Sequence, residues 1–445
     1  MNTPIIDFVR AYAEKNALRL HMPGHKGKSL LGFEALDLTE IAGADSLYEA
    51  EGIIKESENN ASALFGCDTY YSTEGSSLCI RAMAYLVTLY AKEQGRALRI
   101  LAGRNAHKTF LSACALLDID VSWLYSDGDA PYLSCSIAPE TLETAISGMS
   151  ERPIAVYITT PDYLGDVLDI EAISKVCHKY GVLLCVDNAH GAYLGFLPKS
   201  LHPIHLGADI CCDSAHKTLP ALTGGAYLHL TRNAPKVFNE NVKTALSLFG
   251  STSPSYLILQ SLDAVNAYLA DGYAEKLLEF CVMAKSCKQE LSEYGYTFYG
   301  DEPLKFTLKT KPYGYTGYEF ELLLKESGIT VEYSDSDHTV MMLTPEIGEN
   351  GLSRLTGAMK AIKKKAPLTE KTPKACVLKQ VMSIREAMLS PSEALKVEDC
   401  VGRVLAQPTV SCPPAVPIAV CGELLDDDAV SVFKYYGTEY CKVVK

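Results

Sequence analysis

The chain has 445 residues, of which 48% are apolar and 21% are charged, so it has ample material for large buried cores. This composition excludes a disordered or low-complexity protein. With 41 Lys and Arg against 54 Asp and Glu, the net charge is −13, and this sign argues against nucleic acid as a partner.

The cysteines and the apolar runs indicate a cytoplasmic protein. The 15 cysteines are odd in number, form no Cys-x-x-Cys pair and lie mostly in apolar runs, which favours reduced thiols over disulfides or a metal site. No window reaches the roughly 20 apolar residues that a membrane helix needs. The first 16 residues also lack the apolar core of a signal peptide. We therefore expect no membrane partner.

Taken in chain order, the first predicted element is a short amphipathic helix at 3–16, followed by a loop rich in Pro and Gly at 20–32. Between about 56 and 365, apolar runs of strand length alternate with helix-length segments, which favours a mainly parallel sheet covered by helices. The expected strands are 99–103, 121–125, 154–160, 182–187, 208–213 and 225–230. The expected helices include 76–94 and 169–180.

From about residue 255 the pattern becomes richer in helices. Strand-like pieces at 304–309 and 339–344 then predict a second, smaller α+β domain. Residues 360–379 hold seven lysines and predict an exposed linker, and residues 376–405 are expected to be helical. The expected regions are an N-terminal segment at 1–55, a large domain at 56–254, a small domain at 255–365, and a linker with a C-terminal domain at 366–445.

Polar clusters fall at the ends of predicted strands, where ligands of α/β sheets bind. Gly75 permits a tight turn, and Ser76 and Ser77 then open a helix whose N-terminus suits a phosphate, although such a turn is more often an ordinary cap. Asp187 closes the apolar run 182–187, so its charge needs a partner. Taken alone, Asp187 is as well explained by a helix cap or a structural ion pair.

The third cluster is DSAHKTLPALTGG at 213–225, in which Lys217 precedes a Gly-rich turn. A partly desolvated lysine has a lowered pKa and can form a Schiff base with a carbonyl. Pyridoxal 5'-phosphate uses all three clusters, because it has a phosphate, an aldehyde and a pyridine nitrogen that an acidic group keeps protonated. His107 could stack on its ring, although a hydrogen-bonded structural histidine is the alternative.

Together these motifs resemble the ornithine/lysine/arginine decarboxylase family of fold type I pyridoxal phosphate enzymes, in its short form without an N-terminal wing domain. The similarity covers nearly the whole chain. It is carried by LHMPGHKG at 20–27, DLTEIAGADSL at 37–47, GSS at 75–77, NAHK at 105–108, DNAHGAY at 187–193, DSAHKTLPALTGGA at 213–226 and CPPAVPIAVCGE at 412–423. The resemblance implies an α/β fold with a mostly parallel sheet in a large domain, a smaller α+β domain and a C-terminal extension.

The resemblance also implies roles for single residues. Lys217 would form the Schiff base with the cofactor, and Asp187 would pair with the pyridine nitrogen. The ring would lie between His107 and Ala189. The phosphate would be surrounded by Gly75, Ser76, Ser77, Ser214 and His216.

Two further roles concern the substrate. Glu423 would hold the distal amine of a basic substrate, although the residues alone also allow a solvated turn residue at this position. Lys217 or His216 would return a proton to Cα. The chain departs from the family pattern at Glu74, Ile80, Asn188, Ala415 and Cys421, where Asn, Asn, Glu, Gly and Pro are the commoner residues.

The expected function is decarboxylation of a basic L-amino acid, with arginine, lysine and ornithine all open, by at least a homodimer. The products would be carbon dioxide and a polyamine-type amine. One alternative is an aminotransferase or lyase, and transamination would need an arginine clamp, for which the candidates are Arg354, Arg385 and Arg403. Another is a non-catalytic, polyamine-responsive protein with the same fold, against which an intact Lys217 speaks.

Overall fold

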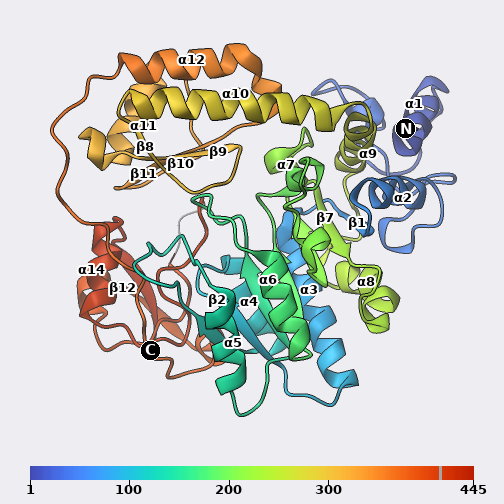
Figure 1. Ribbon diagram of the computed structural model, residues 1–445. Coiled ribbons are helices and arrows are strands. Elements are labelled where there is room, and N and C mark those ends of the chain that lie inside the picture. The colour runs from blue at the N-terminus through green and yellow to red at the C-terminus, as the bar shows by residue number, and fades with distance from the viewer. Residues whose placement is uncertain (410–412) are drawn as a thin grey trace. The chain divides into compact units, whose positions relative to one another are not determined.

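The protein is described by a computed structural model that covers residues 1–409 and 413–445 (Figure 1). It divides into two units, each built from two stretches of chain. Unit 1 is Met1–Arg96 with Leu183–Lys276, and unit 2 is Ala97–Val182 with Leu277–Lys445. Cys412, the first residue of the motif at 412–423, lies outside the described residues. The four regions expected from the sequence remain a prediction.

The strands of unit 1 lie in the order β1-β7-β6-β5. β5 (Leu183–Asp187) and β6 (Ile210–Asp213) are parallel, whereas β7 (Ala226–Leu230) runs antiparallel to both β6 and β1 (Asp68–Ser72). Every residue of β5, β6 and β7 is buried, as apolar strands covered on both faces should be. The strands expected at 182–187, 208–213 and 225–230 are therefore confirmed.

Helices of unit 1 pack on these strands. The bounds are α1 (Pro4–Glu14), α2 (Ile53–Phe65), α3 (Gly75–Glu93), α7 (Ala215–Thr218), α8 (Lys236–Phe249) and α9 (Tyr256–Ala270). Helix α3 contacts β1, β6 and β7 and also lies beside α8 (Figure 1). Gly75 has a φ of +70°, so the chain can turn sharply from β1 into α3. The helices expected at 3–16 and 76–94 are confirmed.

The first part of unit 2 continues the α/β pattern. Its strands lie in the order β4 (Ala155–Thr159), β2 (Arg99–Gly103), β3 (Asp120–Leu124), and β2 is parallel to both of its neighbours. The helices are α4 (Lys108–Leu117), α5 (Pro139–Gly148) and α6 (Ile170–Lys179). The expected strands and the helix at 169–180 are confirmed.

Unit 2 also holds a separate antiparallel sheet of order β10-β11-β9-β8. The strands of this sheet are β8 (Thr297–Tyr299), β9 (Lys305–Lys309), β10 (Tyr333–Ser334) and β11 (His338–Met342). The helices in this part of the chain are α10 (Tyr273–Glu293), which begins in unit 1, α11 (Gly317–Glu326) and α12 (Gly348–Ala361). Helix α11 contacts β10 and β11. The two strand-like pieces expected here are confirmed.

The C-terminal part of unit 2 differs from its prediction. Only α13 (Ile384–Leu389) is an α-helix within 376–405, and β12 (Ser392–Lys396) pairs antiparallel with β13 (Tyr440–Val444). The expected helix is therefore wrong over most of its length. The pairing with a strand some fifty residues later overrides the local pattern, as is usual for strands whose partner lies far along the chain.

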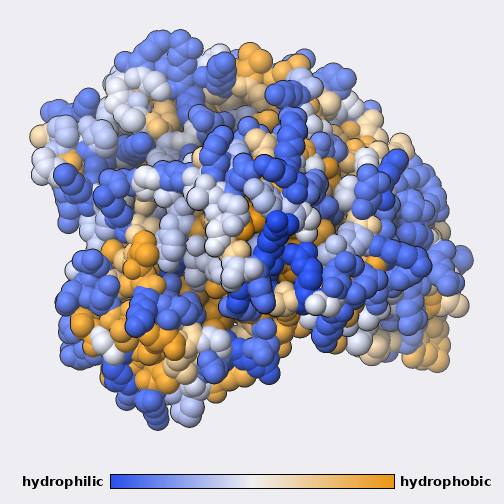
Figure 2. All heavy atoms as spheres, turned by 60° about the horizontal axis from the view of Figure 1, so that its bottom comes forward, coloured by the Kyte–Doolittle hydropathy of each residue, from blue (hydrophilic) through white to orange (hydrophobic). Residues whose placement is uncertain are grey.

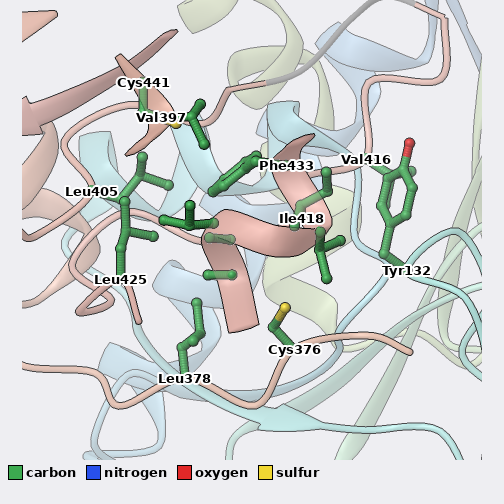
Figure 3. Packing of buried hydrophobic residues seen from close by; sticks show 14 of the residues in the cluster. Tyr132, Cys376, Leu378, Val397, Leu405, Val416, Ile418, Leu425, Phe433 and Cys441 are labelled. Atoms are coloured by element: carbon green, nitrogen blue, oxygen red, sulfur yellow. The ribbon is translucent and has the colours of Figure 1, made fainter. Parts of the chain in front are cut away.

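A core of apolar side chains surrounds α14 (Asp427–Tyr435). Phe433 of this helix is fully buried, and Figure 3 shows the cluster's side chains pointing toward one another from α14 and from the segments around it. Val416, Ile418 and Leu425 belong to the same cluster. The segment that carries the C-terminal motif is therefore anchored by burial. In the described residues, no helix combines the length and apolarity needed to cross a bilayer.

Candidate active site

Lys217 lies in α7, the single helical turn that follows β6 in unit 1. The side chain is half-buried, and its Nζ lies 3.0 Å from Nε2 of His190. The backbone of this turn is tied down, because Lys217 N–H donates to Ser214 O at 3.0 Å and His216 N–H donates to Gly225 O at 3.2 Å. The amine therefore stands on a fixed turn beside an imidazole.

Asp187 is the last residue of β5 and is only 2% exposed. Its Oδ1 accepts from Ala189 N–H at 3.2 Å. Because β5 and β6 are parallel and Asp187 lies beside Cys212, the segments that carry Asp187 and Lys217 leave the sheet at the same edge. The structure thus brings these two predicted residues to one end of neighbouring strands.

The N-terminus of α3 belongs to the same unit. Ser214 Oγ donates to Ser76 Oγ at 2.9 Å, and Ser77 follows in the same half-buried turn. No acidic residue lies in the first turn of this 19-residue helix. The N-cap residue, Glu74, is exposed, and its carboxylate accepts from Ser251 N–H at 2.6 Å. The hydroxyl groups and backbone N–H groups of such a helix N-terminus suit a phosphate.

His216 also faces this region. Its Nδ1 lies 2.9 Å from Gly225 O and donates to that carbonyl, so Nε2 is the ring nitrogen that can face a ligand. Ala189, expected against the cofactor ring, is buried directly after Asp187 and Asn188.

These groups of unit 1 fit pyridoxal phosphate. A half-buried amine suits its aldehyde, a buried carboxylate suits a protonated ring nitrogen, and the α3 N-terminus suits its phosphate. The fit rests on the residue types and on their arrangement at one sheet edge.

His107 and Glu423, the remaining predicted residues, lie in unit 2 and are described by themselves. His107 is the N-cap of α4, and its Nδ1 accepts from Thr109 N–H at 3.1 Å, so the proton of a neutral ring is on Nε2. Glu423 is 1% exposed, which excludes a solvated turn residue. Its Oε2 accepts from Arg104 Nη2 at 3.0 Å and from Val420 N–H at 2.6 Å. Burial raises the pKa of Glu423 although Arg104 opposes this effect.

Sequence reasoning missed Arg104 and His190. Arg104 is 5% exposed, and its guanidinium also donates to the carbonyl oxygens of Pro417 and Ile418. Lys108 N–H, next to His107, donates to Ala415 O at 2.8 Å. The C-terminal motif is thus docked on the segment that holds His107. A signal for Arg104 existed, because a lone arginine closing an apolar strand requires an acidic partner.

The family model of the Orn/Lys/Arg decarboxylases (major domain) matches residues 3–299. The chain belongs to this family. It is 29% identical to an arginine decarboxylase of Halalkalibacterium halodurans, over 97% of this chain and 93% of the relative. Membership of the family makes the protein a decarboxylase.

Solved structures of similar fold include two lysine decarboxylases. That of Francisella novicida has a TM-score of 0.80 at 17% identity and covers 100% of this chain and 81% of the other. Lysine decarboxylase A from Pseudomonas aeruginosa has a TM-score of 0.82 at 17% identity, covering 99% and 80%. The expected fold type I α/β architecture is confirmed by this likeness.

Ala415 generates a first prediction, because its φ of 58° lies in the left-handed region that disfavours any residue with a Cβ. Ala415→Gly relieves this strain, whereas Ala419→Gly, a matched control that is equally buried at 1% exposure, does not. Both variants lose one buried methyl group. We expect Ala415→Gly to be more stable than Ala419→Gly by about 1–2 kcal/mol in urea unfolding. Equal losses of stability would show that Ala415 carries no strain.

Proposed function

We propose that this decarboxylase acts on a basic L-amino acid with pyridoxal 5'-phosphate as its cofactor. The observation that carries the proposal is the placement of Lys217 and Asp187 at one edge of β5 and β6, with Ser214 and Ser76 hydrogen-bonded at the α3 N-terminus of the same unit. Arginine is the first substrate to test, because relatives that match 97% of this chain include arginine decarboxylases of Halalkalibacterium halodurans and Bacillus subtilis. Lysine and ornithine remain candidates.

When bound, the cofactor supplies a cationic ring that accepts the electron pair left at Cα as carbon dioxide departs. Asp187 keeps the proton on the ring nitrogen, because a buried carboxylate favours a cation beside it. Lys217 Nζ is the amine that would hold the cofactor through its aldehyde. His190 Nε2 lies 3.0 Å from Lys217 Nζ and is placed to accept a proton from this amine or return one to it.

The remaining roles concern binding. In this proposal the phosphate is held by the residues at the α3 N-terminus and in the turn before Lys217, which are Gly75, Ser76, Ser77, Ser214 and His216. His107 and Ala189 would lie against the cofactor ring, and Lys217 or His216 would return a proton to Cα.

Transamination receives no support from the three arginines considered for a clamp. Arg354 donates to the carbonyl oxygens of Ser327 and Gly328, and Arg385 to those of Ala115 and Leu116. Arg403 forms an ion pair with Glu393 at 2.7 Å. We therefore keep decarboxylation as the single proposed reaction. We also propose a cytoplasmic location, which the free thiols of the described cysteines support.

The test of the function is a panel of arginine, lysine and ornithine, with carbon dioxide and amine measured after the cofactor is added. Lys217→Ala should lose activity by orders of magnitude, because no other amine of the proposal bonds the aldehyde. Lys236→Ala, which changes an exposed lysine paired with Glu240, is the control and should stay active. Borohydride reduction followed by peptide mapping should place a pyridoxyl group on Lys217. Label on another lysine, or full activity of Lys217→Ala, would refute the assignment.

Glu423 is proposed to bind the distal cationic group of the substrate. Its Oε2 is engaged by Arg104, but its buried Oε1 has no hydrogen-bond partner among the described residues. A buried acceptor without a donor is costly, and a donor from the substrate would remove that cost. Arg104 then serves to hold the carboxylate in place.

Glu423→Gln is expected to raise the KM for the active substrate about tenfold or more while lowering kcat less, because a contact to a remote group is present in ground and transition states alike. The control is Glu393→Gln, which breaks the more exposed ion pair with Arg403 in the same unit. Its KM should not change. Unchanged constants for Glu423→Gln would leave Glu423 with a structural role only.

A homodimer or larger homo-oligomer is the proposed assembly, and the N-terminal segment is the proposed contact. Apolar side chains in this segment are strongly exposed, with Leu30 at 87% and Leu31 at 75%. Glu34 fixes the turn that presents them, because its carboxylate accepts from the backbone N–H groups of residues 30–33. Burial opposes ionisation of Glu34, yet these bonds lower its pKa to about 2.

Exposed apolar side chains that cluster in one segment indicate a surface covered by a partner. On one face of the protein, Figure 2 shows apolar patches between larger hydrophilic areas. The adjoining loop HMPGHKG at 21–27 is proposed to lie at the same interface, near an active site.

Replacement of Leu30 and Leu31 together by Ser should weaken the dimer, because the interface loses two apolar anchors. Sedimentation equilibrium should give a dissociation constant raised at least about tenfold. Leu322→Ser, at an exposed position of α11, is the control and should leave the assembly unchanged. A double variant that associates like the parent chain would reject this contact.

A further inference from the structure

A fully buried polar network lies beside the Asp187 and Lys217 segments. The carboxylate of Asp213, the last residue of β6, is 0% exposed. Its Oδ1 accepts from Asn188 Nδ2 at 2.6 Å, and its Oδ2 accepts from His202 Nε2 at 2.9 Å and His229 Nε2 at 3.1 Å. The side chains of all three donors are 0% exposed as well.

Hydrogen bonds on the far side of each ring orient the two imidazoles toward Asp213. His202 Nδ1 accepts from Ile204 N–H at 3.3 Å, so its proton is on Nε2 and points at Asp213. His229 Nδ1 lies 2.9 Å from Thr69 Oγ1, and burial lowers the pKa of His229, although Asp213 opposes this effect. Both oxygens of Asp213 therefore receive donors from fully buried side chains.

The network joins the two segments that the proposed chemistry needs. Asn188 directly follows Asp187, and Asp213 lies four residues before Lys217. Asn188 N–H also donates to Cys212 O at 2.9 Å, which extends the pairing of β5 and β6 by one residue. The bond from Asn188 to Asp213 thus ties the end of β5 to the end of β6.

The placement of Asn188 depends on that bond and on the space around it. Its Oδ1 has no hydrogen-bond partner among the described residues, so the contact with Asp213 is what orients the amide. A Cβ built at Gly191 would lie 2.1 Å from this oxygen, so residue 191 leaves the space that the side chain of Asn188 occupies. The loop of residues 188–191 is shaped around the bond.

We propose that Asn188 and Asp213 are positioning residues that set Asp187 against Lys217, so that a cofactor bonded to the lysine amine meets the carboxylate with its ring nitrogen. This inference rests on the proposed function. The two residues touch neither substrate nor cofactor. They act by fixing the relation of two strand ends.

The matched control is Asn266→Ala. Asn266 is also 0% exposed and in unit 1, and its amide donates to Ser57 O at 3.0 Å and Tyr71 OH at 2.7 Å. It makes the same kind of buried hydrogen bond as Asn188 but is tied to neither strand end. A comparison of the two variants separates general loss of stability from loss of positioning.

The experiment measures the dissociation constant for pyridoxal phosphate, the visible absorbance of the bound cofactor across pH, and the melting temperature. Asn188→Asp places two carboxylates in contact, and we expect cofactor affinity to fall about tenfold or more and the pH midpoint of the absorbance to shift. Asn188→Ala should change both quantities in the same direction but less. Asn266→Ala should lower the melting temperature without changing the cofactor affinity or the pH midpoint of the absorbance.

Rescue gives the sharper test. The double variant with Asn188→Asp and Asp213→Asn restores an amide-to-carboxylate bond in reversed order, and we expect affinity within about threefold of the parent chain. Where Asn188→Asp does not fold, the Asn188→Ala and Asn266→Ala pair decides. A folded double variant without rescue, or an Asn188→Ala variant that binds and absorbs like the parent chain, would overturn the inference. Absence of cofactor binding at Lys217 in the parent chain would instead refute the proposed function.

Discussion

A carboxylate that is wholly removed from water has to be satisfied by donors, and at Asp213 this requirement constrains most of unit 1. Moving a charged group into an apolar interior without partners costs several kcal/mol, so the native state is stable only when the donors are in place. The donors come from the ends of β5 and β7 and from the segment before residue 203. None of these segments can shift alone without exposing the charge to an unfavourable environment.

Unit 2 also contains a buried carboxylate, that of Glu423, but its hydrogen bonding differs from that of Asp213. Arg104 and Glu423 are both buried and paired at 3.0 Å, but Arg104 Nε and Glu423 Oε1 have no hydrogen-bond partner among the described residues. At Asp213, by contrast, both oxygens receive donors. A carboxylate whose two oxygens both accept hydrogen bonds from the protein is suited to a structural role. A carboxylate with one oxygen that accepts none can still bind a donor from a ligand. This difference is why we assign positioning to Asp213 and substrate binding to Glu423.

Local patterns predicted most of the α/β fold, because buried parallel strands are short apolar runs and the helices between them are periodic. The half-buried β1, with the sequence DTYYS, escaped detection because its polar and aromatic residues show no clear alternation and its partner β7 lies far along the chain. The expected helix at 376–405 was wrong for the same reason, since β12 depends on pairing with β13. Pairing over long sequence separation leaves no local trace.

In the candidate site too, the sequence predicted residue types but not the contacts between them. The motifs pointed to Lys217 and Asp187, whereas the contact of His190 with the lysine amine required the fold. Asn188 illustrates the point best. In sequence it is only a departure from the commoner Glu, but in the structure its amide faces Asp213, where a glutamate would bring a second carboxylate toward the first. The two positions therefore have to be considered as a pair, and substitutions at either one are not expected to be additive with substitutions at the other.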